Sequence, residues 1–255
     1  MIANSLPIGW RLSIYLLAGI AAGISNGIAG GGTFITFPTM LALGIPALQA
    51  NVSSSVGVLP SYVGGIRGYR QELLRRWPLV RQLLPACLAG VATGAALLLL
   101  GRPETFRSIV PWLILVATLL FATGPVITRR IAHLGHHGLR MRALHIGMFV
   151  ISVYGGYFGA GLGIMLLALM GLTLPDDLDT LQGLRSALST IINAVAALIF
   201  LVRGHLVAEA VIMLFIGTLI GGYFGTKLIR RLRPATVRIL IVTIGLATSL
   251  NLLLR

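Results

Sequence analysis

The sequence predicts an all-α integral membrane protein built from two inverted-topology repeats. Hydrophobic residues make up 56% of the 255 residues, charged residues 10%, and the mean hydropathy is +0.94. This leaves too little polar surface to cover a soluble core of such size. The hexapeptide that starts at Arg102 (RPETFR) returns 131 residues later as RPATVR, starting at Arg233. Each half holds five hydrophobic segments, an odd number, so the second half would enter the membrane upside down relative to the first.

The hydrophobic segments have similar positions in the two halves. The predicted ranges are 12–29, 33–45, 48–66, 79–100 and 108–128, followed by 143–160, 162–174, 184–202, 206–226 and 237–254. A complete helical crossing needs about 20 apolar residues. The short segments 33–45 and 162–174 are therefore expected to be broken or half-helices, or hairpin partners of the segment before them. The expected units are a first transmembrane repeat (1–128), a cytoplasmic basic linker (129–142) and a second transmembrane repeat (143–255).

The basic residues predict the orientation. One set of alternate connections is rich in them: Arg67, Arg70, Arg75, Arg76, Arg129, Arg130, Arg140, Arg142, Lys227, Arg230, Arg231, Arg233 and Arg238. The other side carries Arg11, Arg102, Arg107, Arg203 and Arg255. The positive-inside rule makes the rich side cytoplasmic and places both termini outside. If each short segment merged with its predecessor into one broken crossing, the basic loops would be split between the two faces. The net charge of +14 is spread over short loops, which favours anionic membrane lipids as partners and no nucleic acid.

Glycines mark two expected breaks and several packing stripes. Gly30, Gly31 and Gly32 lie where a long segment gives way to a short one, and Gly161, Leu162 and Gly163 lie at the equivalent place in the second half. An unwound backbone followed by a short helix leaves free N–H groups at the positive end of a helix dipole, so two such ends would form a cradle for an anion. Glycines at four-residue spacing elsewhere suit close helix contacts, within the chain or in a homo-oligomer.

Polar side chains within the segments supply further candidate ligands. Thr33 follows the first break, and the third segment begins with Asn51, Ser53 and Ser54. Ser186, Ser189 and Asn193 in the eighth segment share one helix face. Alternatively, Ser and Thr bond to the carbonyl four residues back and Asn links helices. Arg185 could meet a substrate anion, pair with Asp179 or extend to the membrane interface.

Few groups suited to other chemistry are present. The six acids lie in loops or near a segment start, so none is expected at the bilayer centre, and an anionic or neutral substrate is favoured over a cation. His133, His136 and His137 have no Cys or acid partners for zinc, and Cys87 is single. We therefore expect no metal, cofactor or catalytic residues.

The motifs resemble those of a known family. Gly27-Ile28-Ala29-Gly30-Gly31-Gly32, Pro38, Gly44 and Ala50-Asn51-Val52-Ser53-Ser54 are similar to the first-half signature of the sulfite exporter TauE/SafE family of membrane permeases. The stretch from Tyr154 to Gly163 resembles its second-half G-x-x-x-G-x-G-x-G, and Asn193, Phe200 and Gly204 fall where its N, F and G lie. Ser53 replaces the usual Thr, and Arg185-Ser186 stands near where relatives often carry Ser-Lys or Lys.

The resemblance implies transport of sulfite, sulfonates, sulfoacetate, thiosulfate or other small organic anions across a bacterial cytoplasmic membrane. The breaks and polar clusters independently predict an anion site between the two halves, with alternating access around it. Two alternative functions remain open. A passive anion channel would use the same cradle, and an intramembrane enzyme would need convergent catalytic groups.

Overall fold

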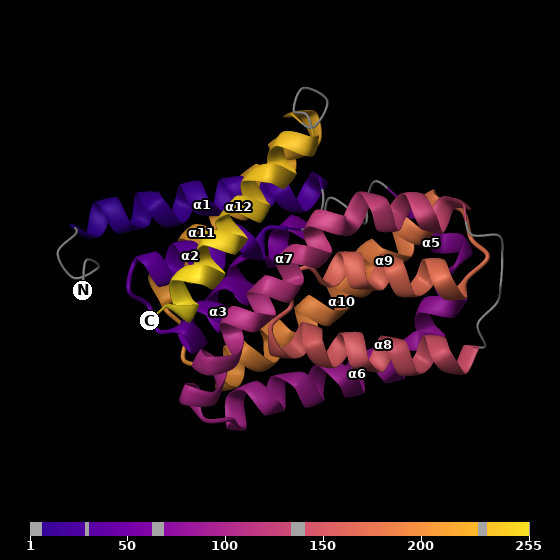
Figure 1. Ribbon diagram of the computed structural model, residues 1–255, viewed down its shortest axis with the longest axis horizontal. Coiled ribbons are helices and arrows are strands. Elements are labelled where there is room, and N and C mark those ends of the chain that lie inside the picture. The colour runs from indigo at the N-terminus through magenta and orange to yellow at the C-terminus, as the bar shows by residue number, and fades with distance from the viewer. Residues whose placement is uncertain (1–6, 29–30, 63–68, 134–140, 229–233, 255) are drawn as a thin grey trace.

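The computed structural model describes residues 7–28, 31–62, 69–133, 141–228 and 234–254, and the regular structure in these ranges is helical (Figure 1). Within these ranges, four helices contain stretches long and apolar enough to cross a membrane: Ile8–Asn26 of α1 (Ile8–Ile28), α6 (Trp77–Leu100), Pro103–Ile127 of α7 (Pro103–His133) and α10 (Leu178–Arg203). Large apolar side chains face outward on several of them; Leu100, for example, is 87% exposed. This confirms the prediction of an all-α membrane protein.

Two short helices occupy the predicted short segments. They are α2 (Thr33–Ala42) and α9 (Leu162–Thr173), with 10 and 12 residues. At about 1.5 Å per residue their lengths are about 15 and 18 Å, well below the roughly 30 Å of a bilayer core. The remaining elements are α3 (Ala47–Gly57), the 3₁₀-helix η2 (Leu59–Tyr62), α5 (Arg70–Arg75), α8 (Met141–Tyr157), α11 (Ala208–Leu228) and α12 (Pro234–Leu253).

The prediction of one continuous span over 48–66 is wrong. Helix α3 ends at Gly57, and η2 follows from Leu59. Pro60 explains the interruption, because it has no backbone N–H to continue the α-helical ladder and it disfavours helical geometry in the residue before it. The counterpart α10 has no proline and runs unbroken for 26 residues.

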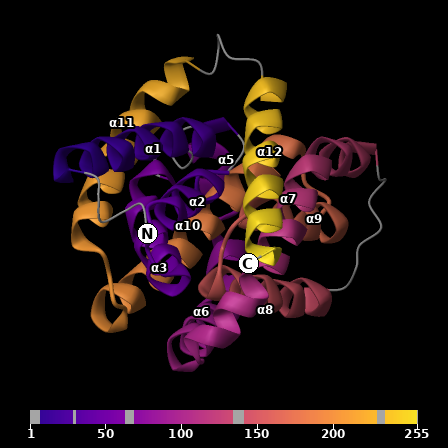
Figure 2. The same cartoon turned by 60° about the vertical axis from the view of Figure 1, so that its left-hand side comes forward.

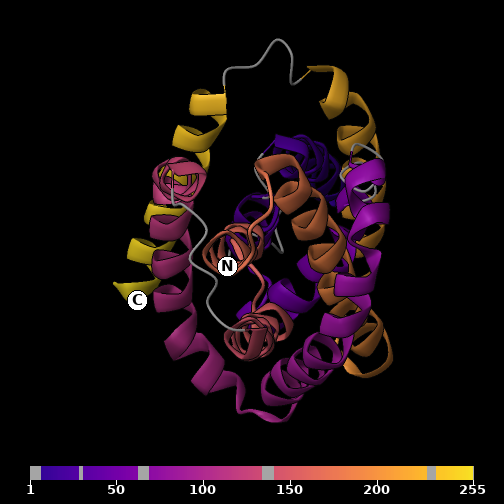
Figure 3. The same ribbon diagram turned by 90° about the vertical axis from the view of Figure 1, so that its right-hand side faces the viewer.

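Helix positions repeat with the same offset as the sequence. The starts of α3 and α10, at residues 47 and 178, differ by 131, and so do those of α6 and α11, at 77 and 208, and of α7 and α12, at 103 and 234. Helix α1 packs against α11, α6 against α8, and α7 against α12 (Figure 2). Viewed end-on, α7 and α12 lie along one side and α11 along the opposite side, with α9 and α10 between them (Figure 3).

Glycines allow the closest of these contacts. A Cβ on Gly23 of α1 would lie 2.5 Å from the carbonyl oxygen of Thr218 in α11. A Cβ on Gly90 of α6 would lie 2.5 Å from the carbonyl oxygen of Phe149 in α8. Side chains of any size would therefore separate the backbones, so these glycines have the packing role expected of the stripes.

Candidate functional site

The chain between α8 and α9 turns sharply at two glycines. Gly159 and Gly161 have φ angles of +78° and +74°, which lie in the left-handed region that a side chain disfavours. The Tyr154 hydroxyl donates a 2.6 Å hydrogen bond to the carbonyl of Ala160 and holds the turn in place. We call residues 157–161 the second break.

The second break leaves a backbone donor at the start of α9. Leu162 N–H donates to the Gly159 carbonyl at 3.3 Å, and Ile164 N–H donates to the Gly161 carbonyl at 3.0 Å. No side chain caps the helix. Among the described residues, Gly163 N–H has no acceptor. This N–H points from the positive end of the α9 dipole.

Arg185 of α10 lies beside Gly163, the residue that carries this free N–H. A Cβ on Gly163 would lie 3.5 Å from Arg185 Cδ and 3.6 Å from Nη1. The ion pairs among the described residues are Arg11–Glu209 and Arg76–Asp176, so the expected alternative of an Arg185–Asp179 pair is not found. A cation beside the positive end of a helix is unfavourable by itself. An anion at this place would accept from both Arg185 and Gly163 N–H.

The polar face of α10 continues from Arg185 toward the second break. Ser189 and Asn193 follow at four-residue steps and therefore share its face. Ser189 is 5% exposed, and its hydroxyl has no hydrogen-bond partner in the described part of the chain. Asn193 Nδ2 donates to the Ser189 carbonyl at 2.8 Å, and its Oδ1 lies against Gly159. Ser186, in contrast, donates to the carbonyl of Gln182 four residues back, as the structural alternative predicted.

Helix α3 contributes one predicted residue to the second break. Asn51 Nδ2 donates to the Tyr157 carbonyl at 3.0 Å, which joins the first half of the chain to the end of α8. The other two predicted ligands have different contacts. Ser54 shares a hydrogen bond with Thr36 of α2, and Ser53 Oγ accepts from Val207 N–H at 2.9 Å, just before α11.

The first break is occupied by the protein's own groups. Gly30 lies outside the described residues. Gly32 N–H, predicted to face an anion, donates to Asn26 Oδ1 at 2.6 Å, and Asn26 Nδ2 donates to Ser61. Gly31 packs against aromatic and aliphatic side chains, and Thr33 is buried. The two breaks therefore differ at these groups: Asn26 accepts from Gly32 N–H at the first break, whereas Gly163 N–H and the Ser189 hydroxyl near the second have no partner among the described residues.

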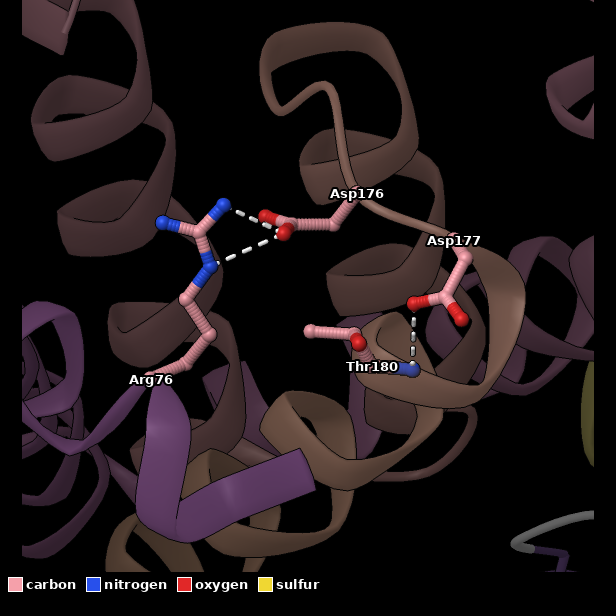
Figure 4. A network of polar contacts seen from close by, with 4 residues as sticks. All are labelled: Arg76, Asp176, Asp177 and Thr180. Carbon is pink, nitrogen blue, oxygen red and sulfur yellow. Dashed lines mark hydrogen bonds and ion pairs between the residues drawn. The ribbon is translucent and has the colours of Figure 1, made fainter. Parts of the chain in front are cut away.

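An ion pair and a helix cap fix the start of the helix that carries Arg185 (Figure 4). Arg76 Nε donates to Asp176 Oδ1 at 2.8 Å, linking α6 to the loop before α10. Asp177 Oδ1 accepts from the N–H of Thr180 at 3.2 Å and caps α10. Hydrogen bonding by Thr180 lowers the pKa of Asp177. These contacts position the start of α10 relative to α6.

Apolar helices long enough to cross a bilayer, interrupted by short helices with polar groups at the break, place this chain among membrane transport proteins. The family described as "Sulfite exporter TauE/SafE" matches residues 15–252, and the chain belongs to this family. The resemblance noted in the sequence motifs is thereby confirmed.

Bacterial relatives match nearly the whole length. A "Probable membrane transporter protein" of Haemophilus influenzae is 26% identical over 244 residues, covering 91% of this chain and 90% of the relative. "Probable membrane transporter protein ORF9" of Sinorhizobium sp. is 24% identical, with coverage of 95% and 92%. "Probable membrane transporter protein YfcA" of Escherichia coli K12 is 21% identical, with coverage of 95% and 89%.

Proposed function

We propose that this protein transports small organic or sulfur-containing anions, such as sulfite, sulfonates or sulfoacetate, across the bacterial cytoplasmic membrane. One observation carries the proposal: Arg185, without a carboxylate partner, lies beside the free Gly163 N–H at the start of α9. A sulfonate or sulfite presents several acceptor oxygens and would satisfy both donors. Ser189, with its unpartnered hydroxyl one turn along α10, would complete the site.

Alternating access by two inverted repeats, with units 1–128 and 143–255 joined by the basic linker 129–142, is the mechanism that fits this site best. If each helix is replaced by its counterpart in the other half, the α1–α11 contact becomes the α8–α6 contact, and the α7–α12 contact stays the same. All three contacts are present, which supports two related units. Figure 1 shows α1 and α8 starting at opposite ends of the molecule. The Asn51–Tyr157 bond crosses between the units at the second break, so relative motion of the halves would open or close the site.

The orientation follows from the charges. We place the connection with Arg76 and Asp176 in the cytoplasm and both termini outside. The ion pairs are consistent with this arrangement: Arg76–Asp176 joins two connections expected inside, and Arg11–Glu209 joins two positions expected outside. The six acids lie in these loops or near helix ends, which gives no support to an intramembrane enzyme.

Uptake into proteoliposomes tests the function. Radiolabelled sulfite and a short sulfonate are supplied outside, with the matched carboxylate as a comparison and empty liposomes as background. We expect saturable uptake that accelerates when unlabelled anion is present inside. At low substrate concentration, Ser189→Ala should take up the anion at least about tenfold more slowly, which matches the usual free energy of a lost hydrogen bond to a charged group. Non-saturating current without trans-stimulation would favour the passive channel, and no anion flux would contradict the proposal.

A further inference from the structure

The side chain of Asn51 leaves a buried acceptor at the second break. Its Nδ2 donates to the Tyr157 carbonyl, and this bond fixes which way the amide points, because a flipped amide would set its oxygen against the carbonyl oxygen. Oδ1 is therefore the amide atom that does not bond to the Tyr157 carbonyl. Asn51 is 0% exposed, and Oδ1 has no donor among the residues that the structure describes. Leaving a buried acceptor without a hydrogen bond costs about 1–3 kcal/mol of folding free energy, so a ligand bound to this oxygen would be stabilising.

Asn193 presents a second amide oxygen to the same segment. Its Nδ2 donates to the Ser189 carbonyl, which fixes the amide orientation in the same way. A Cβ on Gly159 would lie 3.8 Å from Asn193 Oδ1. No described donor is bonded to this oxygen. The amides of Asn51 and Asn193, from different halves of the chain, thus reach two positions only two residues apart, Tyr157 and Gly159.

The backbone at this place adds negative potential. Helix α8 ends at Tyr157, and the carbonyl end of a helix carries the negative end of its dipole. The anion site proposed above uses the opposite pole, at the start of α9. Arg185 and Asn193 are eight residues apart on α10, or about 12 Å at 1.5 Å per residue. A cation at the second break would therefore be separated from the Arg185 guanidinium and would interact favourably with an anion between them.

We propose that Asn51 Oδ1, Asn193 Oδ1 and carbonyls of the second break bind a dehydrated monovalent alkali cation. The ligands are neutral oxygens, and the six carboxylates of the chain lie elsewhere. Divalent Ca²⁺ and Mg²⁺ are normally bound with carboxylates, whereas unwound carbonyls and helix C-terminal ends suit Na⁺ in transporters. This site goes beyond the proposed anion transport, since it holds a second ligand. Its occupancy would couple anion movement to a cation gradient.

Thermal unfolding of the purified full-length protein in detergent tests binding directly. The melting temperature is measured in NaCl, KCl or LiCl, each titrated against choline chloride at constant chloride and ionic strength, with no substrate anion added. We expect the melting temperature to rise and saturate with one of the three alkali cations. The dependence of this rise on cation concentration gives the dissociation constant through mass action. No rise with any of them would overturn the proposal and assign the two oxygens to buried water. This readout does not depend on anion transport, so either proposal can fail alone.

Three leucine variants locate the site. In Asn51→Leu and Asn193→Leu we expect the cation dissociation constant to rise at least about tenfold, the lower end of the loss seen when metal-site groups are removed. Asn26→Leu is the matched control, because Asn26 lies at the first break and its Oδ1 already accepts from Gly32. It should lower the melting temperature but leave the dissociation constant unchanged. Unchanged cation affinity in both Asn51→Leu and Asn193→Leu would overturn the assignment.

Discussion

Replacing Arg185 with methionine should have opposite effects on the stability of the free protein and on anion binding. Methionine keeps a long unbranched side chain but removes the positive charge beside the start of α9. A charge at a helix end changes stability by about 0.3–1 kcal/mol, and here the change relieves repulsion. For a chain of this size that corresponds to a rise of about 1–3 °C in melting temperature.

Anion binding should weaken in the same variant. A hydrogen bond to a charged group contributes about 1.5–3 kcal/mol, which corresponds to a roughly 10- to 150-fold higher dissociation constant. Both quantities come from one assay, thermal unfolding with and without titrated sulfite or a short sulfonate. Arg185→Lys keeps the charge without the planar guanidinium and should lie between the two proteins in affinity.

The matched control lies at the other end of the same helix. Arg203 stands in the last turn of α10, where a cation interacts favourably with the dipole. Arg203→Met should therefore lower the melting temperature slightly and leave the anion dissociation constant unchanged. If Arg185→Met lowered the melting temperature and bound anions as the unchanged protein does, Arg185 would be a packing residue and the reasoning would be refuted.

Three further predictions concern the scaffold. Gly23→Ala should destabilise the protein by about 1–3 kcal/mol, because its Cβ would lie 2.5 Å from a backbone carbonyl oxygen of α11. The control Gly9→Ala places its Cβ where no atom lies within 4 Å, so it should be neutral or stabilising in thermal unfolding. Equal effects of the two substitutions would contradict the close helix contact. A double-mutant cycle of Arg76→Ala and Asp176→Ala should give a coupling energy of about 0.5–3 kcal/mol, since Asp176 is only 8% exposed, and strict additivity would show that the pair does not act. The folded-state pKa of Asp177 lies below its ordinary value of 3.8, so the stability from this cap is present above that value and is lost as pH falls below it through the folded pKa. Asp177→Asn should lack this acid-dependent loss in melting temperature, and an unchanged pH profile would argue against the charged cap.

The sequence predicted the helices well because their signals are local. Apolar runs, the short segments and the 131-residue repeat predicted most helices, although the predicted starts 79 and 206 each differ by two residues from the observed 77 and 208. The error at 48–66 came from reading hydrophobicity without giving enough weight to Pro60. Local sequence patterns do not show which polar groups contact one another in the folded protein.

The site depended on tertiary contacts that the sequence does not display. The glycine motifs located both breaks, but nothing local shows that Asn26 fills the first or that Tyr154 braces the second. Arg185 was a candidate ligand with a competing partner, Asp179. Only the packing of α10 against α9 places its guanidinium beside Gly163.

The most direct test is an experimental structure with 2-bromoethanesulfonate bound, in which the bromine is located by anomalous scattering. The central claim is that the start of α9 and the polar face of α10 hold an anion. We expect the sulfonate within hydrogen-bonding distance of Gly163 N–H and the Arg185 guanidinium, with the bromine signal nearby and lost in Arg185→Met. A sulfonate bound elsewhere in the protein, with Arg185 and Gly163 uncontacted, would contradict the account.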